Sequence, residues 1–237
     1  MVRLLTTGYE SGDPVGTDTT SGTGTVAAES TVVNSGIASK KYTAPASTDR
    51  AYTLHNIGTP NAEVFFRVYF RYTGTLPNGG VRDWFWSIAS SGSALINIAL
   101  YENFGSPVLR LRRGNTLYAN PAPVTADTWH CVEARLVMSA GGDDYTEWRV
   151  DGVSYGDQTA AMSSSLFQTV RIGAAGDDGV GDFTGVTFYV DDIAINDTTG
   201  GSDDTWVGLI SSGSSEIARL IDGSLIDGSL VGKGLVN

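Results

Sequence analysis

TWHCVEARLVMSAGGDDYTEWRVDGVSYGD, residues 128–157, is the stretch that decides the fold class. Two runs in it alternate apolar and polar side chains, and a segment rich in glycine and aspartate separates them at 140–144. This period of two is typical of β-strands that bury one face. Asp151-Gly152 then suits a tight turn with positive φ. We therefore predict a hairpin followed by a second reversal, and the core-facing side chains in it are Val132, Ala134, Leu136, Met138, Trp148 and Val150.

The same alternation occurs along much of the chain. In EVFFRVYFRY, residues 63–72, the even and the odd positions form two separate faces. Further short runs lie at 83–90, 94–102, 108–114 and 115–120, with Gly, Ser, Asn or Pro at each junction. Many short strands at this spacing indicate a β-sandwich or barrel. No stretch before residue 214 keeps a helical period, so the predicted class is all-β.

A change of phase occurs in VTFYVDDIAIND, residues 186–197. Apolar side chains occupy even positions up to Val190 and odd positions from Ile193 onward. One extra residue at Asp191-Asp192 explains the change, as a β-bulge does.

Composition narrows the function classes. The chain has 237 residues, 41% of them hydrophobic and 17% charged, with a formal net charge of −11. Such an acidic surface repels nucleic acid, so we expect no nucleic-acid partner. The single cysteine, Cys131, excludes an internal disulfide, and its apolar surroundings indicate a buried, inert thiol. No signal-peptide core and no run approaching the roughly 20 apolar residues of a membrane span occurs, so we expect synthesis in a cytoplasm and no membrane partner.

The C-terminal region differs from the rest. LIDGS-LIDGS-LVGKG, residues 220–234, repeats every five residues and opens each unit with an aliphatic pair. We predict a sandwich domain over 1–200 and a linker with an extended docking segment over 201–237, which pairs with or lies along a neighbouring protein. The alternative is a flexible terminus.

Three motifs resemble the concanavalin A-like lectin/glucanase superfamily, in particular its laminin-G-like jelly rolls. They are residues 128–133 (TWHCVE), 148–153 (WRVDGV) and 188–195 (FYVDDIAI). The resemblance implies a two-sheet antiparallel jelly-roll sandwich. The start at 3–12 and the glycine-rich tail are similar to structural proteins of tailed-phage particles, which implies a virion protein made in the host cytoplasm.

A carbohydrate-binding face is one candidate site. Sugars stack their CH faces on aromatic rings and need polar partners for their hydroxyls. If Phe85 points to the core, both neighbouring tryptophans point outward. The predicted binding residues are Trp84, Trp86, Tyr101, Arg110 and Arg112. The alternative is that both tryptophans are buried.

A calcium site is the other candidate. Hard cations require several oxygen ligands, and laminin-G-like domains, by the resemblance, hold calcium at their rim. The predicted ligands are Asp177, Asp178 and Asp182, in GAAGDDGVGDF. The alternative is that these are ordinary turn aspartates that hydrogen-bond their own backbone.

Catalytic motifs are missing from the sequence. The superfamily's catalytic E-x-D-x-E pattern does not occur, and Glu147 with Asp151 is a poor substitute because Asp151 lies in a turn. A lyase of this fold needs a His or Tyr base beside Arg and Gln. His130 lies within a strand, His55 is expected near a surface, and neither has a recognisable partner motif. We therefore predict no catalytic residues and a non-enzymatic protein.

The predicted function is adhesion by a virion structural protein, displayed on capsid or tail in many copies. It is held to other virion proteins by its C-terminal segment and binds surface glycans. Two alternatives stay open: a decoration protein that cements the capsid without binding glycans, and a hydrolase or lyase that degrades polysaccharide.

Overall fold

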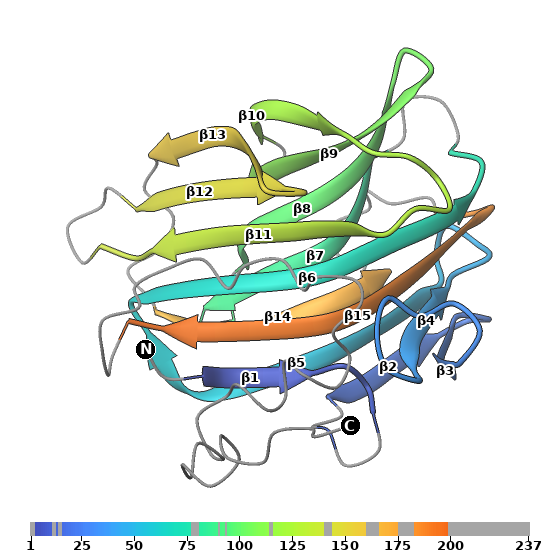
Figure 1. The fold of residues 1–237 in the computed structure, drawn as a ribbon, viewed down its shortest axis with the longest axis horizontal. Coiled ribbons are helices and arrows are strands. Elements are labelled where there is room, and N and C mark those ends of the chain that lie inside the picture. The colour runs from blue at the N-terminus through green and yellow to red at the C-terminus, as the bar shows by residue number, and fades with distance from the viewer. Residues whose placement is uncertain are drawn as a thin grey trace, which may run out of the picture.

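Two antiparallel β-sheets packed face to face form the molecule in the computed structural model (Figure 1). The structure describes residues 3–10, 13, 16–76, 81–89, 91–92, 94–113, 116–139, 144–159, 166–174 and 183–198. Within these ranges every regular element is a strand. The predicted all-β, two-sheet antiparallel sandwich is confirmed. The predicted docking segment and the domain boundary at 200 lie outside the described residues.

Sheet A has the order β13-β12-β11-β6-β15-β4-β3, and β1 also pairs with β15. Its strands are β1 (Arg3–Thr7), β3 (Thr25–Glu29), β4 (Ser39–Thr43), β6 (Glu63–Gly74), β11 (His130–Val137), β12 (Tyr145–Val150), β13 (Val153–Thr159) and β15 (Val186–Asp197).

Sheet B has the order β10-β9-β8-β7-β14-β5-β2. Its strands are β2 (Thr17–Ser21), β5 (Arg50–Asn61), β7 (Val81–Ala89), β8 (Ala94–Asn103), β9 (Ser106–Arg113), β10 (Thr116–Pro123) and β14 (Phe167–Ala174). Because β14 lies between β7 and β5, this sheet brings together segments far apart in the sequence. Within the described residues no helix is long and apolar enough to cross a membrane.

The hairpin predicted at 128–157 is present as β11 and β12. Val132 pairs with Val150 and Ala134 with Trp148, and all four side chains are buried. Asp151 takes the predicted positive φ of 52°. Its carboxylate accepts a hydrogen bond from the Cys131 amide at 2.8 Å, which fixes the turn to the start of β11.

The bulge predicted in β15 is also present. The register with β6 shifts between Asp191 and Ala194, and Asp192 has a φ of 49°. The extra residue turns the second half of the strand, so that Ile193 and Ile195 face the core as Val190 does.

The centre of the core is aromatic. The rings of Phe66 and Phe85 stack with centroids 4.4 Å apart, and those of Phe70 and Trp84 stack at 4.1 Å, so each pair joins the two sheets. Large aromatic side chains bury much apolar surface, and this burial is the main term that stabilises the sandwich.

Trp84 corrects the predicted sugar-binding face. Its exposed fraction is 0%, and a register shift between Asp83 and Phe85 turns Trp84 and Phe85 to the core together. The prediction that Phe85 inward requires Trp84 outward is therefore wrong, because a bulge interrupts the alternation at this point.

Candidate functional site

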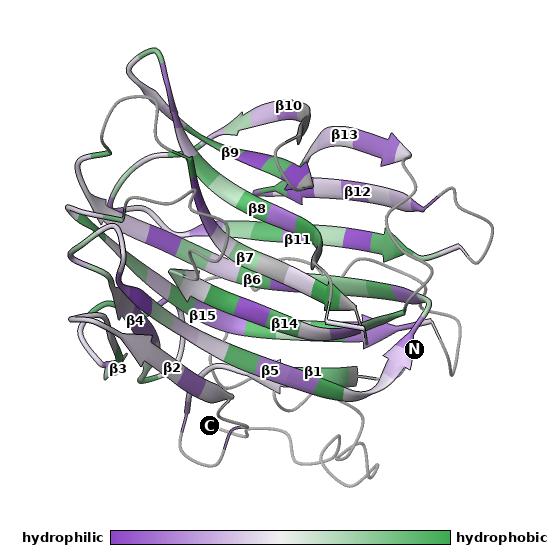
Figure 2. Ribbon diagram, turned by 180° about the vertical axis from the view of Figure 1, so that it is seen from behind, coloured by the Kyte–Doolittle hydropathy of each residue, from purple (hydrophilic) through white to green (hydrophobic). Residues whose placement is uncertain are grey.

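The register of sheet B lines up residues of five strands in one row across the sheet. The register aligns Arg112 of β9 with Asn97 of β8, and Asn97 with Trp86 of β7. Trp86 is in turn opposite Arg171 of β14, which is opposite Leu54 of β5. These positions form one row across the sheet, and Figure 2 views the molecule from the side of sheet B.

Beside Arg171 lies a small apolar patch. Ile88 of β7 packs against the partly buried side chains of Tyr52 and Leu54 on β5, outside the main core. The Arg171 guanidinium lies over the Tyr52 ring, with its central carbon 4.6 Å from the ring centroid. A guanidinium over an aromatic ring is attracted by the ring's negative face and is held in one orientation. The patch therefore combines an apolar surface with a fixed cation.

The electrostatic surroundings of Arg171 favour an anionic neighbour. Burial lowers the pKa of its guanidinium from the usual value, and the nearby positive charge of Arg50 lowers it further, while Tyr52 acts in the opposite direction. A desolvated cation beside another cation gains from any anion that enters the site. Arg171 is therefore suited to receive a carboxylate.

A buried ion pair supports the same face from the side of β8 and β9. Arg112 Nη1 donates to Asp83 Oδ2 at 2.8 Å, and Asn97 Nδ2 donates to the same oxygen at 3.3 Å. All three side chains are almost completely buried. Removing one partner from such a pair leaves a buried charge without compensation. The cluster thus holds three strands in register rather than offering its own groups to a ligand.

A second stack of arginine on tyrosine lies further along β8 and β9. The Arg110 guanidinium carbon is 5.3 Å from the centroid of the Tyr101 ring, and both side chains are half-buried. With the Arg171–Tyr52 stack, it gives the outer face of sheet B two cation–aromatic pairs.

The predicted carbohydrate-binding residues therefore separate. Tyr101 and Arg110 lie together on the outer face of sheet B, and Arg112 is buried behind that face with Asp83. Trp84 is in the core. The backbone of Trp86 lies between Asn97 and Arg171, and its side chain is outside the described part of the structure.

Sequence reasoning missed Tyr52 and Arg171. In FQTVRIGA, residues 167–174, alternation with Val170 and Ile172 gives the outward face of Arg171. In RAYTLHN, residues 50–56, it gives the wrong face for Tyr52, because apolar Tyr52 and Leu54 alternate with Thr53 and His55, which are the buried side chains. What the alternation does not give is the pairing of β14 with β5, which brings the two side chains together.

Two arginines on the outer face of sheet A pair with glutamates. Arg135 forms an ion pair with Glu63 at 2.6 Å, and Arg149 forms one with Glu147 at 3.3 Å. An incoming carboxylate would have to displace these glutamates. Of the carboxylates considered for hydrolysis, Glu147 pairs with Arg149, and Asp151 holds the β12–β13 turn to the Cys131 amide.

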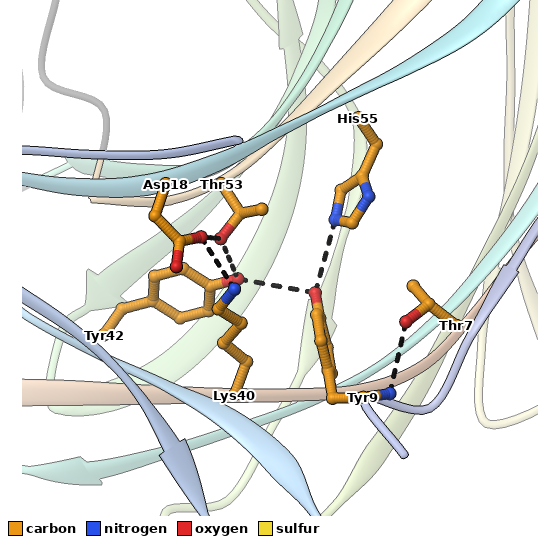
Figure 3. A network of polar contacts seen from close by, with 7 residues as sticks. All are labelled: Thr7, Tyr9, Asp18, Lys40, Tyr42, Thr53 and His55. Atoms are coloured by element: carbon orange, nitrogen blue, oxygen red, sulfur yellow. Dashed lines mark hydrogen bonds and ion pairs between the residues drawn. The ribbon is translucent and has the colours of Figure 1, made fainter. Parts of the chain in front are cut away.

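A buried polar network lies between the sheets at the β4–β5 edge (Figure 3). The Tyr9 hydroxyl is 3.5 Å from His55 Nε2 and 3.4 Å from the Tyr42 hydroxyl, which donates to Thr53 Oγ1 at 3.0 Å. Thr53 also donates to Asp18 Oδ1 at 2.7 Å, and Lys40 Nζ is 2.7 Å from the same oxygen, so Asp18 and Lys40 complete the network.

His55 belongs to this network and not to the surface. Its exposed fraction is small, and burial lowers its pKa to about 4, so the ring is neutral at neutral pH. The expectation of a surface position is wrong because His55 shares the inward face of β5 with Ala51 and Thr53. Burial also raises the pKa of both Tyr9 and Tyr42, so neither phenol is activated as a base.

Metal ligation has little support from the described side chains. Among them, no group of three or more His, Cys, Asp or Glu residues is arranged to hold a metal ion. At the β15 bulge, the Asp191 carboxylate accepts from the amides of Asn34 and Ser35, while burial and the charge of Asp192 raise its pKa to about 8. The predicted calcium ligands Asp177, Asp178 and Asp182 lie outside the described residues.

Comparisons with known proteins find similar folds among solved structures only. No protein-family model matches the chain, and no curated protein matches it. Among solved structures, an endo-β-1,4-glucuronan lyase from the fungus Trichoderma reesei is similar with a TM-score of 0.61 and 22% identity, over 83% of this chain and 96% of that one. The cellulose-induced protein Cip1 is similar at 0.58 and 17%, over 84% and 100%. A carbohydrate esterase from Shiga toxin-encoding bacteriophage phi24B is similar at 0.58 and 15%, over 82% and 97%.

These similarities show the fold, a two-sheet β-sandwich that this chain shares with a glucuronan lyase, with Cip1 and with a carbohydrate esterase. They also correct one prediction. Two of the three proteins are named as enzymes, a lyase and an esterase. The prediction of a non-enzymatic protein is therefore wrong, because proteins with this fold include enzymes.

Proposed function

We propose that the chain is a polysaccharide lyase that cleaves an acidic, uronate-containing polysaccharide on the outer face of sheet B. The observation that carries the proposal is the Arg171 guanidinium fixed over the Tyr52 ring beside an apolar patch. This arrangement joins a cation for the uronate carboxylate, a hydroxyl for proton transfer and a surface on which sugar CH groups pack. The similarity to a glucuronan lyase supports the same class of substrate.

The reaction is a β-elimination. A base removes the proton from the ring carbon that carries the carboxylate, and that electron pair forms the C4–C5 double bond. The C4–O bond of the glycosidic linkage breaks, and the leaving oxygen takes up a proton. Because negative charge accumulates on the carboxylate in the transition state, a cation at that position lowers the barrier.

Arg171 and Tyr52 have the groups that this reaction requires. Arg171 is proposed to pair with the carboxylate, since its planar guanidinium matches two oxygens at once and its own burial favours an anion. Tyr52, whose ring the Arg171 guanidinium covers, is proposed to move the proton at its hydroxyl oxygen. Leu54, packed on the buried Ile88, supplies apolar surface for the sugar ring.

The test is the release of unsaturated uronate ends from glucuronan and alginate, followed by their ultraviolet absorbance. Tyr52→Phe keeps the ring under Arg171 and removes the hydroxyl, so we expect kcat to fall about 100- to 10,000-fold with little change in KM. Arg171→Ala removes the charge, so we expect kcat/KM to fall by about 100-fold or more. Arg149→Ala on sheet A is the matched control, and we expect it to keep wild-type kinetics because Arg149 lies on the opposite face of the sandwich.

Two outcomes contradict the proposal. One is the absence of unsaturated ends from every acidic polysaccharide tested, including the case in which saturated reducing ends or acetate are released instead. The other is a lyase activity that Tyr52→Phe and Arg171→Ala leave unchanged while both variants keep the wild-type melting temperature.

The predicted place of action is a phage particle, and it stays a prediction. It is supported by the similarity to a bacteriophage carbohydrate esterase and by the resemblance of the chain ends to phage structural proteins. Detection of the chain in purified, nuclease-treated particles by mass spectrometry would support it, and recovery only in the particle-free lysate would oppose it.

A further inference from the structure

The β8–β9 hairpin carries a fully exposed phenylalanine at its tip. Phe104 has an exposed fraction of 99%, the highest among the exposed large hydrophobic side chains of the described residues, where Ile37 follows at 71%. A phenyl ring in this position buries no apolar surface within the molecule. Folding therefore gives no reason for an aromatic residue here.

The backbone at Phe104 makes this choice of residue still less favourable. Asn103 pairs with Ser106, so that Phe104 and Gly105 form a two-residue turn with φ values of 50° and 86°. Turns of this kind favour asparagine or glycine at the first central position, because a side chain with a Cβ is strained at positive φ. Residues held in such conformations cluster at functional sites.

The hairpin is well placed to extend the substrate face. Its tip projects past the body of the sandwich in both overall views (Figures 1 and 2). Tyr101 of β8, three residues before Phe104, is covered by the Arg110 guanidinium from β9. The cation–aromatic character of the outer face of sheet B thus continues along this hairpin up to its tip.

From these observations we infer that Phe104 is a stacking site for a remote part of the polysaccharide chain. The inference rests on the proposed function. The occupant is an acidic polysaccharide that runs from the Arg171–Tyr52 stack along Tyr101 and Arg110. An exposed phenyl ring stacks on the CH face of a sugar, while the guanidinium attracts its carboxylate.

Two variants at this position separate binding from folding. Phe104→Ala removes the ring, and Phe104→Asn removes it with a residue that tolerates positive φ and keeps the turn intact. Ile37→Ala is the matched control, because it removes another exposed apolar side chain. Affinity electrophoresis of the full chain in gels that contain glucuronan or alginate gives a Kd for each protein without requiring catalysis.

We expect both Phe104 variants to bind the polymer about 2- to 10-fold more weakly than wild type and Ile37→Ala. Turnover of a uronate trisaccharide should not change, because so short a ligand does not reach the tip. Equal retardation of Phe104→Ala, Phe104→Asn and wild type overturns the inference, as does a wild type that neither polymer retards. The proposed lyase function can fail separately from this inference. In that case the polymer binds in a way that depends on Phe104, but no unsaturated products are released.

Discussion

His55 shows how burial sets the chemistry of a single side chain. In the sequence it is one of two histidines and a natural candidate for a base, but in the structure it lies between the sheets beside Tyr9. Its pKa of about 4 means that the neutral ring is the form compatible with folding. Conversely, no sequence motif marks Arg171 as a site residue. Its proposed role depends on the Tyr52 ring on which its guanidinium stacks.

The depressed pKa of His55 predicts a pH dependence of stability. The unfolded chain binds a proton at His55 near pH 6.5 and the folded chain only near pH 4, so the free energy of unfolding falls as the pH decreases from about 6.5 to 4. His55→Gln removes this contribution, which is on the order of 3 kcal/mol across the window. Urea unfolding at several pH values should show a smaller acid loss in the variant than in wild type.

The pH dependence of the free energy of unfolding must be compared as a difference between His55→Gln and wild type. Asp191, whose pKa is raised to about 8, works in the opposite direction, because its protonated form is favoured in the folded chain and stability is lost as the pH rises toward 8. Asn56→His, which adds a histidine at an exposed position of β5, is the control and should keep the wild-type slope. If the free energy of unfolding of His55→Gln fell with decreasing pH as steeply as that of wild type, the account would be contradicted.

At the scale of strands, two bulges show what a sequence pattern can reveal. The bulge in β15 was predictable because apolar residues change from even to odd positions on either side of Asp191-Asp192. The bulge in β7 was not, since residues 84–86 are all aromatic and contain no alternation to interrupt. This is why the orientation of Trp84 could not be obtained from the sequence, and with it part of the candidate site.

Gly173 of β14 provides a test at the same scale. It has a φ of 117°, and a Cβ there would lie 2.4 Å from the Ala51 carbonyl oxygen and 2.6 Å from the Tyr42 ring. We expect Gly173→Ala to lower the free energy of unfolding by about 2–4 kcal/mol, through backbone strain and overpacking together. Gly58→Ala, at a positive φ with nothing within 4 Å of the added Cβ, isolates the strain and should cost about 1 kcal/mol. If urea unfolding showed the same loss of free energy for Gly173→Ala and Gly58→Ala, the close packing of β14 on β5 described above would be wrong.

At the scale of the whole molecule, the sequence was sufficient for the sandwich and insufficient for the site. The alternation of side chains and the turn residues depend on local chemistry. They determine that strands form and, in β11, β12 and β15, which face is buried. The candidate site depends instead on pairing across the sheet, which brings residues 52, 88 and 171 together from three strands that are not consecutive. No local pattern encodes that pairing, so Tyr52 and Arg171 became visible only in the structure.

Hydrogen–deuterium exchange of the full-length Tyr52→Phe variant, with and without glucuronan, tests the central claim most directly, since this variant should bind the polymer without cleaving it. The account predicts slower exchange of peptides from β5, β7, β14 and the β8–β9 hairpin, and unchanged exchange in β6, β11 and β12. Protection confined to β6, β11 and β12, or no protection in any strand at saturating polymer, would contradict it.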